Sequence, residues 1–338
     1  MPAKPPSSVL IYVGFDRIGD SLLKLPFVRS LRQAFPDAQI TWLAGREDSV
    51  YSGIMAELAD GLIDEIIENA GIGVTPKEII LGHGGGPLAG RRFDLIIDTQ
   101  RNFWTSLSLF RVPHEMFISP AAGFLMSGLK PKRGYKFPKT MQRQLLDLLE
   151  IASGQNFPTP LTLDLNLKPK TIELARLLLP PGPDYIGFAP GSGGPPKCWP
   201  LEYFIELARR QKDQGRQPVF FLGPKELAWR EQISGAISDA LFPLQDDRAG
   251  GDYLFSPMLT IAMAGLLSAA LSNDSGSGHM FAIGGVAVVI LYGPTRPDKF
   301  MPMTDKLSIV QAQDFGGREM RSIPLKAVEE ALESAIKV

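Results

Sequence analysis

The chain has 338 residues, which is more than one hydrophobic core usually organises, so we expect two domains. Its formal net charge of -1 excludes a general basic field for nucleic acid, and no apolar run is long enough to span a membrane. The only cysteine, Cys198, excludes an internal disulfide, and the first residues lack the apolar region of a signal peptide, so we expect a cytoplasmic protein.

Short apolar runs alternate with amphipathic segments along the whole chain, which predicts an α/β protein with parallel sheets and helices on both faces. In the first half we expect strands at Val9–Val13, Gln39–Leu43, Ile63–Ile67 and Phe93–Asp98. The helix after the first strand has apolar residues at helical spacing, namely Leu22, Leu23, Val28 and Leu31. Pro26 predicts a kink or a late start in this helix.

The second half repeats the alternation after the proline-rich segment 180–184. Its expected strands are Tyr185–Ala189, Val219–Leu222, Ala270–Ser272 and Val286–Tyr292. Its expected helices are Leu201–Gln214, Glu226–Ala236, Pro257–Leu267 and Leu325–Ile336. We therefore expect domains over residues 1–175 and 176–322. Residues 323–338 form a last helix that can pack back on the first domain.

The stretch "GFDRIGD" (Gly14–Asp20) joins the first strand to the first helix. It has neither the lysine of a P-loop nor the three glycines of a dinucleotide fingerprint. Asp20 follows the carboxyl end of the strand, where open α/β sheets bind ligands. Two interpretations remain at this stage: a general base, or a helix N-cap, a position that aspartate favours.

The stretch "APGSGGPPKCWP" (Ala189–Pro200) follows the first strand of the second half. The hydroxyl of Ser192 and backbone N–H groups around Gly193 can turn toward an anion, and Lys197 adds a mobile positive charge. The alternative is a Gly/Pro-rich loop with an exposed lysine. Cys198 lacks the companions of a catalytic thiol, so we interpret it as a packing residue.

Two further strand ends carry polar side chains. Glu226 in "FLGPKE" can accept hydrogen bonds from ribose hydroxyls, or merely complement a helix dipole. "LSNDSGSGHMFAIG" places Asp274, Ser275 and Gly276 before a helix that should begin near residue 278, with His279 in its first turn. Such a helix start can bind a phosphate, unless Ser and Asp only cap it. Because these loops follow strands of one domain, we expect them to converge on one cleft.

A basic stretch, "KPKRGYKFPK" (Lys130–Lys139), interleaves Lys132 and Arg133 with Tyr135 and Phe137. Arg101 follows another strand end. These cations can engage phosphate or carboxylate groups of a glycolipid, or the anionic face of a membrane. The alternative is a solvated surface loop.

The motifs together resemble glycosyltransferase family 9, whose best-known members are ADP-heptose:lipopolysaccharide heptosyltransferases. The resemblance rests on "GDSLLKLPFVRSLRQAFPDAQITWL", "PGSGGPPKCWPLEYFIELA", "FLGPKE" and "NDSGSGHMFAIGGVAVVILYGPT". It implies a GT-B fold, in which two Rossmann-like domains face each other across a cleft. The acceptor belongs to the first domain and the nucleotide-sugar donor to the second. The chain departs from the family at Phe15–Arg17, where Ser or Leu is common.

The resemblance implies an inverting transfer that uses no metal and no cofactor, with Asp20 as the catalytic base. It assigns donor binding to Ser192, Gly193, Lys197, Glu226, Asp274, Ser275, Gly276 and His279. Arg101, Lys132 and Arg133 are the expected acceptor-binding residues. The expected partners are a nucleotide-sugar, ADP-linked by preference, a glycolipid or oligosaccharide acceptor such as lipopolysaccharide core, and the inner membrane as a peripheral contact; nucleic acid is not one. A nucleotide-sugar epimerase or hydrolase of the same fold, and a non-catalytic nucleotide-sugar-binding protein, remain alternatives.

Overall fold

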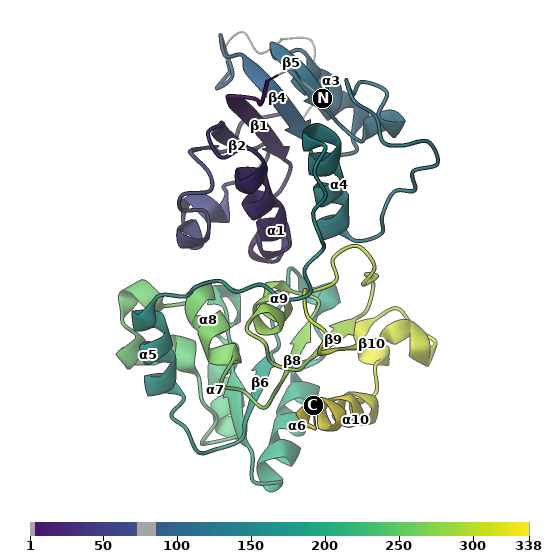
Figure 1. Ribbon diagram of the computed structural model, residues 1–338. Helices are drawn as coiled ribbons and strands as arrows, with labels where there is room; N and C mark the ends of the chain where they lie inside the picture. The colour runs from purple at the N-terminus through teal and green to yellow at the C-terminus, as the bar shows by residue number, and fades with distance from the viewer. Residues whose placement is uncertain (1–3, 73–85, 338) are drawn as a thin grey trace. The chain divides into compact units, whose positions relative to one another are not determined.

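The computed structural model describes residues 4–72 and 86–337, which form two compact units divided between Pro160 and Leu161. Each unit contains one five-stranded sheet in which all neighbouring strands are parallel. Parallel strands need crossover connections, and helices supply them in both units (Figure 1). No helix in the described ranges is long and apolar enough to cross a bilayer.

The first unit has the strand order β3-β2-β1-β4-β5. Its strands are β1 (Ser8–Val13), β2 (Gln39–Ala44), β3 (Glu65–Ile67), β4 (Phe93–Asp98) and β5 (His114–Ile118). Its helices are α1 (Ile18–Ala34), α3 (Phe103–Phe110) and α4 (Met141–Ser153). Helices α1 and α4 lie side by side (Figure 1). The order of strands reverses between β1 and β4, which is where such sheets bind ligands.

The second unit has the strand order β10-β9-β8-β6-β7. Its strands are β6 (Tyr185–Ala189), β7 (Gln217–Phe220), β8 (Ala269–Asn273), β9 (Val288–Tyr292) and β10 (Leu307–Gln311). Its helices are α5 (Pro169–Leu178), α6 (Leu201–Asp213), α7 (Trp229–Ala236), α8 (Pro257–Ala264), α9 (Gly276–Ile283) and α10 (Leu325–Ile336). Here the order reverses between β6 and β8.

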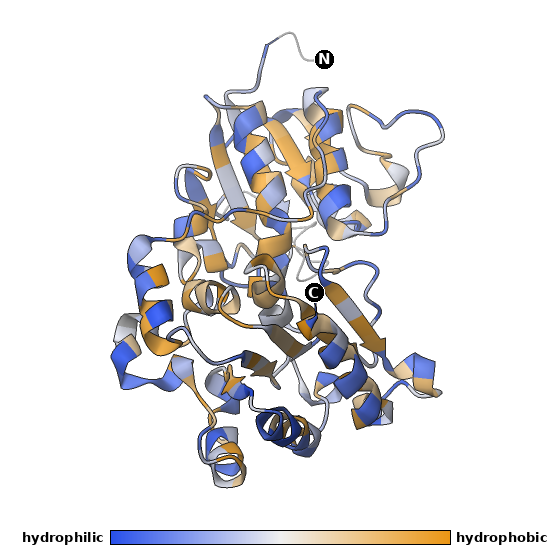
Figure 2. Ribbon diagram, turned by 60° about the horizontal axis from the view of Figure 1, so that its bottom comes forward, coloured by the Kyte–Doolittle hydropathy of each residue, from blue (hydrophilic) through white to orange (hydrophobic). Residues whose placement is uncertain are grey.

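The core of the second unit has two layers because successive side chains of each strand point to opposite faces. Ile186 and Phe188 of β6 pack with residues of α6, α7 and α10, whereas Tyr185 packs with residues of α5, α8 and α9. Most strand residues are therefore apolar, and much of the strand ribbon is orange in Figure 2. Because a strand buried on both faces appears as a continuous apolar run, such strands can be predicted from the sequence.

Several local expectations differ from the structure. Helix α1 begins at Ile18 and includes Pro26, so the expected late start is wrong. Strands β5 and β10 were not expected. Helix α5 packs against α8 of the second unit, which moves the division of the chain from residue 175 to Pro160. The apolar face of α10 lies in the core of the second unit, so that unit supplies the packing surface that the sequence left open.

Candidate active site

Asp20 lies in the first turn of α1, just beyond the carboxyl end of β1. The N-cap of this helix is Arg17, in extended conformation, so the interpretation of Asp20 as the cap is wrong. A carboxylate in the first turn is still favoured by the helix dipole, by about 0.3–1 kcal/mol. The pKa of Arg17 is raised, mainly by its hydrogen bond to Glu47 and also by the charge of Asp20. Asp20 is half-buried and lies in the loop-to-helix segment that the motif indicated.

A second carboxylate in the same loop, Asp16, is the centre of a buried network that the sequence did not indicate. Lys24 Nζ lies 2.9 Å from Asp16 Oδ1, and Ser21 Oγ donates to the same oxygen at 2.7 Å. Trp42 Nε1 donates to Oδ2 at 2.9 Å, and the Ser49 hydroxyl also donates there. The network joins the β1–α1 loop to α1, to β2 and to the segment after β2, so the loop that leads to Asp20 is held from several sides.

The network keeps Asp16 charged although the residue is only 1% exposed. Burial by itself would raise the pKa of Asp16, but the charge of Lys24 and the hydrogen bonds from Ser49, Lys24 and Ser21 outweigh it and hold the pKa below its usual value. The ammonium group of Lys24 also donates to the carbonyl oxygen of Phe15. Asp16 and Lys24 therefore form a buried ion pair with further hydrogen-bond partners on both sides.

In the second unit, the loops after β6 and β8 meet where the strand order reverses. Lys197 Nζ lies 2.8 Å from Asp274 Oδ2, so the cation of one loop and the carboxylate of the other form an ion pair. Thr295, in the loop after β9, donates from Oγ1 to the same carboxylate oxygen at 2.7 Å. The expected convergence of Lys197 and Asp274 is confirmed, and Thr295 joins them as a residue that the sequence did not single out.

Asn273 fixes the spacing between the same two loops. Its Oδ1 accepts from the backbone N–H of Trp199 at 3.0 Å, and its Nδ2 donates to the carbonyl oxygen of Pro190 at 2.6 Å. The side chain of Asn273 is fully buried at the end of β8. The amide thus fixes both ends of the glycine-rich loop to the central strand, which keeps the intervening residues at the sheet edge.

Ser192 and Gly193 lie within that loop and leave backbone groups accessible. The hydroxyl of Ser192 donates to the carbonyl oxygen of Gly194 at 3.0 Å and accepts from its N–H at 3.3 Å. Gly193 is exposed and faces open space. The loop is therefore a short turn closed by its own serine, with room on its outer side. Cys198 contributes two weak contacts, from its Sγ to Ser192 Oγ at 3.5 Å and to the Gly194 carbonyl oxygen at 3.7 Å.

Glu226, in the segment after β7, lies next to Gly191 in the glycine-rich loop. A methyl group at Gly191 would come within 2.6 Å of the Glu226 carboxyl carbon, and one at Gly223 within 2.7 Å of its Oε2. Two glycines thus leave the space in which the carboxyl group lies, so a side chain at either position would displace the carboxyl group of Glu226. Burial raises the pKa of Glu226, against the effect of hydrogen bonds to backbone N–H groups and of the Lys225 charge. Glu226 therefore lies directly against the loop that follows β6.

Helix α9 starts at Gly276, slightly earlier than expected, with Ser275 as its N-cap. The side chain of Ser275 makes no capping hydrogen bond; its Oγ lies 3.1 Å from Ser272 Oγ. The interpretation of this serine as a simple cap is therefore wrong. His279 is 8% exposed, and burial lowers its pKa to about 4, against the effect of the Asp274 charge. The imidazole is neutral near pH 7, so it can donate one hydrogen bond without adding a charge.

The three expected acceptor residues lie in the first unit. The guanidinium of Arg101 lies 4.3 Å from the ring centre of Phe137, so the residue after β4 and the basic stretch are side by side. Lys132 and Arg133 are exposed in the same stretch. The structure thus brings together two features that the sequence placed separately.

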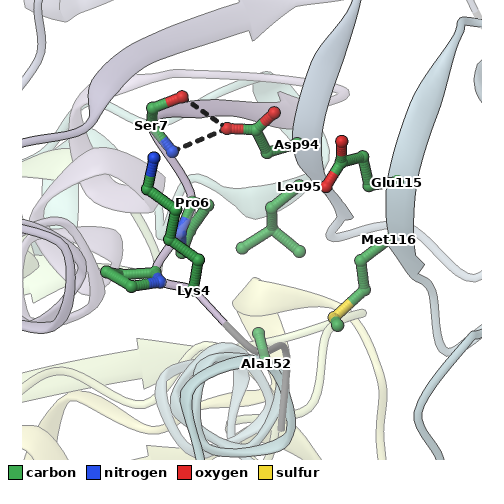
Figure 3. Close-up of a pocket in the computed structure, with 9 residues that line it drawn as sticks. Lys4, Pro6, Ser7, Asp94, Leu95, Glu115, Met116 and Ala152 are labelled. Atoms are coloured by element: carbon green, nitrogen blue, oxygen red, sulfur yellow. Dashed lines mark hydrogen bonds between the residues drawn. The ribbon is translucent and has the colours of Figure 1, made fainter.

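Two further features of the described residues concern metal ligands and a hollow in the first unit. In the described ranges, no three His, Cys, Asp or Glu side chains are grouped as metal ligands would be. A hollow of about 440 Å³ in the first unit is lined by Lys4, Asp94 and Glu115 (Figure 3). It lies at the amino ends of β1, β4 and β5, and the Ser7 N–H and hydroxyl donate to Asp94 at 2.7 Å and 2.6 Å. The hollow is therefore at the opposite edge of the sheet from the motifs.

A family comparison agrees with this arrangement. The model of glycosyltransferase family 9 (heptosyltransferase) matches residues 86–323. The chain belongs to glycosyltransferase family 9. It is a glycosyltransferase, and the expected α/β fold of the GT-B type is confirmed. The family match includes Lys197, Glu226, Asp274 and His279, whereas Asp20 lies before its first residue.

Alignments with individual relatives cover most of the length of this family 9 glycosyltransferase. Lipopolysaccharide heptosyltransferase 2 of Escherichia coli (strain K12) is 26% identical over an alignment of 320 positions, which covers 89% of this chain and 87% of that protein. The solved family 9 glycosyltransferase of Veillonella parvula superposes with a TM-score of 0.68 at 20% identity, covering 98% of this chain and 97% of the other. The E. coli heptosyltransferase WaaC, solved with ADP, gives 0.65 at 18% identity, covering 97% and 99%. These structural similarities support the fold.

Proposed function

We propose that this glycosyltransferase moves a heptose-type sugar from an ADP-linked donor to a lipopolysaccharide-core or related bacterial acceptor. The observation that carries the proposal is the cluster of Lys197, Asp274 and Thr295 where the second sheet reverses its strand order, with Glu226 against Gly191 at the start of the glycine-rich loop. Open α/β sheets bind nucleotides at this position. The sugar and nucleotide follow the printed descriptions of relatives, which include lipopolysaccharide heptosyltransferase 2 and WaaC with ADP.

The second unit is the proposed donor domain. Lys197 exchanges Asp274 for the diphosphate of the donor, and the free N–H groups at the start of α9 add donors to the same anion. Ser192, Gly193, Ser275 and Gly276 border this anion from the two loops. The Glu226 carboxyl accepts hydrogen bonds from ribose hydroxyls, and neutral His279 donates one to a phosphate or sugar oxygen. Asp274, released from Lys197, accepts from sugar hydroxyls.

The first unit is the proposed acceptor domain, with Asp20 as general base. The acceptor oxygen bonds to the anomeric carbon while Asp20 takes its proton, and the bond from that carbon to the diphosphate oxygen breaks with its electron pair. One displacement inverts the anomeric configuration. Lys197 and the α9 dipole stabilise the leaving diphosphate, so the mechanism needs no divalent metal. Arg101, Lys132 and Arg133 hold anionic groups of the acceptor.

The test combines the purified full-length chain, ADP-heptose and heptose-deficient lipopolysaccharide, with release of ADP as the readout. We expect Asp20→Asn to lower kcat at least about 10²-fold with unchanged affinity for ADP, because a general base contributes about 10²–10⁴-fold. Asp37→Asn, an exposed carboxylate in the same unit, is the matched control. Full activity of the Asp20 variant would refute its role.

Further arms test the remaining parts of the proposal. Lys197→Ala should weaken ADP binding in calorimetry, and an unchanged affinity would count against its role. Activity should persist in EDTA, and loss of activity there would refute the metal-independent mechanism. The product should have the anomeric configuration opposite to that of the donor, and a retained configuration would refute the single displacement. Consumption of donor without any acceptor would instead favour an epimerase or hydrolase.

A further inference from the structure

The segment that connects β5 to α4 has an unusual charge for this chain. Between Met116 and Met141 it contains five Lys and Arg residues and no Asp or Glu, whereas the whole chain has a net charge of -1. The five are Lys130, Lys132, Arg133, Lys136 and Lys139, and all are exposed. In Figure 1 this segment forms a long loop beside α4. A local positive field of this kind attracts an anionic partner.

Large apolar side chains are exposed next to these cations. Trp104 is 58% exposed and Leu125 is 64% exposed, and Phe103 packs edge-on against Trp104 with ring centres 5.4 Å apart. Single exposed apolar residues are common on protein surfaces. A tryptophan and a leucine beside a run of lysines are, however, the combination that binds at a membrane–water interface.

Printed ring contacts join the two sets of residues into one surface. The Arg101 guanidinium stacks on Phe137, and Tyr135 packs between Phe137 and Phe124 with ring centres 6.2 Å and 5.8 Å away. The Tyr135 hydroxyl donates to Asp147 of α4 at 2.6 Å, which anchors the loop to the unit. Arg101 lies two residues before Phe103, the first residue of α3, and Phe124 immediately precedes Leu125. We call the residues Arg101–Trp104 and Phe124–Lys139 the basic aromatic surface.

The turn before Leu125 maintains its exposure at some conformational cost. Ala122 and Phe124 both have left-handed backbones, with φ of 48° and 66°. Such conformations in residues other than glycine cost of order 1 kcal/mol each and persist where the surroundings fix them. Phe124 is buried against Tyr135, whereas its neighbour Leu125 projects into solvent. The turn therefore holds an apolar side chain outward instead of burying it.

We propose that the basic aromatic surface docks this glycosyltransferase on an anionic phospholipid bilayer. The lysines attract lipid phosphates, while Trp104 and Leu125 insert at the level of the headgroups. A soluble anion would bind the lysines but would not contact the exposed side chains of Trp104 and Leu125. The inference rests on the proposed function only in that a lipid-anchored acceptor gives docking a purpose, since vesicle binding is measured without any substrate.

The experiment is co-sedimentation of the full-length chain with two kinds of vesicles, phosphatidylcholine alone and phosphatidylcholine mixed with phosphatidylglycerol. We expect binding to the anionic vesicles only. Binding should weaken as salt rises, because the Debye length falls from about 10 Å at 0.1 M to about 3 Å at 1 M. Equal binding to both vesicles, or binding that requires lipopolysaccharide in them, would overturn the proposal.

Two variants divide the surface into its charged and apolar parts. Each basic residue near a membrane contributes about 1 kcal/mol, or about fivefold, so Lys136→Glu with Lys139→Glu should lower the partition coefficient at least about 25-fold. The matched control reverses two exposed lysines of the second unit, Lys299→Glu with Lys326→Glu, and should lower it far less.

Trp104→Ala with Leu125→Ser should lower binding to anionic vesicles while the remaining binding keeps its salt dependence. Leu177→Ser, an exposed leucine of α5, is the control. All variants should turn over a water-soluble acceptor fragment as the unchanged protein does. Loss of that activity together with vesicle binding would mean that the substituted residues of the surface hold the acceptor and not the bilayer. Failure of the proposed transferase activity would leave the vesicle measurements unaffected.

Discussion

Replacement of Lys24 by methionine tests whether the Asp16 network stabilises the first unit. Lys24→Met keeps an unbranched chain of similar length but removes the ammonium group 2.9 Å from Asp16 Oδ1. The Lys24 side chain is 5% exposed and that of Asp16 is 0% exposed, so water cannot replace the lost charge. Breaking a buried ion pair from one side costs about 3–5 kcal/mol, because the remaining charge stays buried without compensation.

The exchange of backbone amides in β1 with solvent deuterium measures this loss in the first unit alone, which matters because two units can unfold separately. At about 1.4 kcal/mol per factor of ten, we expect exchange that proceeds through unfolding to become roughly 10²- to 4 × 10³-fold faster. Arg17→Met is the matched control in the same loop. Its partner Glu47 lies 2.7 Å away, but the Arg17 side chain is 66% exposed, so its removal should cost less than about 1 kcal/mol.

The dependence on pH distinguishes an electrostatic effect from a packing defect. The pKa of Asp16 is lowered in the folded protein, so its contribution to stability is present above the unfolded pKa and is lost as pH falls through the folded pKa. Without Lys24 the effect of burial remains, so we expect the pKa to rise. At acid pH, Asp16 of the variant becomes protonated and no longer carries an uncompensated buried charge. The difference in free energy of unfolding between the variant and the unchanged protein should therefore shrink from pH 7 toward pH 4. A deficit that is constant with pH would refute the reasoning.

Three further predictions address other residues. Gly191→Ala places a methyl group 2.6 Å from the Glu226 carboxyl carbon, so calorimetry should show at least about tenfold weaker ADP binding with an unchanged melting temperature; unchanged affinity would count against Glu226. The ring of His279 should show no titration above about pH 5 by NMR, since its pKa is about 4, and a midpoint near 6.5 would contradict its burial. Burial raises the pKa of Asp98 to about 6, so its contribution to stability is lost as pH rises from about 4 through 6. Asp98→Asn should remove that part of the pH dependence of unfolding, and an unchanged slope would exclude the assignment.

The sequence predicted the central strands and the edge strands β3 and β7, but it missed the edge strands β5 and β10, for a physical reason. Strands such as β1 and β6 are buried on both faces and appear as continuous apolar runs. Strands β5 and β10 lie at sheet edges, where partial burial permits charged or polar residues and weakens the hydrophobic pattern. Their positions follow from the fold and not from their own residues.

The same distinction applies to the candidate site. Loops that follow adjacent strands converge by topology, so the pairing of Lys197 with Asp274 could be expected from their strand ends. The Asp16 network could not be expected, because Trp42 and Ser49 lie 26 and 33 residues further along the chain. They donate hydrogen bonds to Asp16 only because β2 packs beside β1. Thr295 likewise reaches Asp274 from 21 residues further along the chain. Spacing within a motif cannot show such partners.

The two units reach their candidate sites through different strand orders but by one rule. In the first sheet the order reverses between β1 and β4; Asp20 lies in the first turn of the helix that follows β1, and Arg101 lies in the loop that follows β4. In the second sheet it reverses between β6 and β8, and the loops contain Lys197 and Asp274. In open α/β sheets in general, the loops at such a reversal leave toward opposite faces of the sheet, and a crevice opens between them. The proposed general base Asp20 and the proposed donor-binding residues Lys197 and Asp274 therefore all follow strands that flank the reversal of their sheet, which is the position at which open α/β sheets bind ligands.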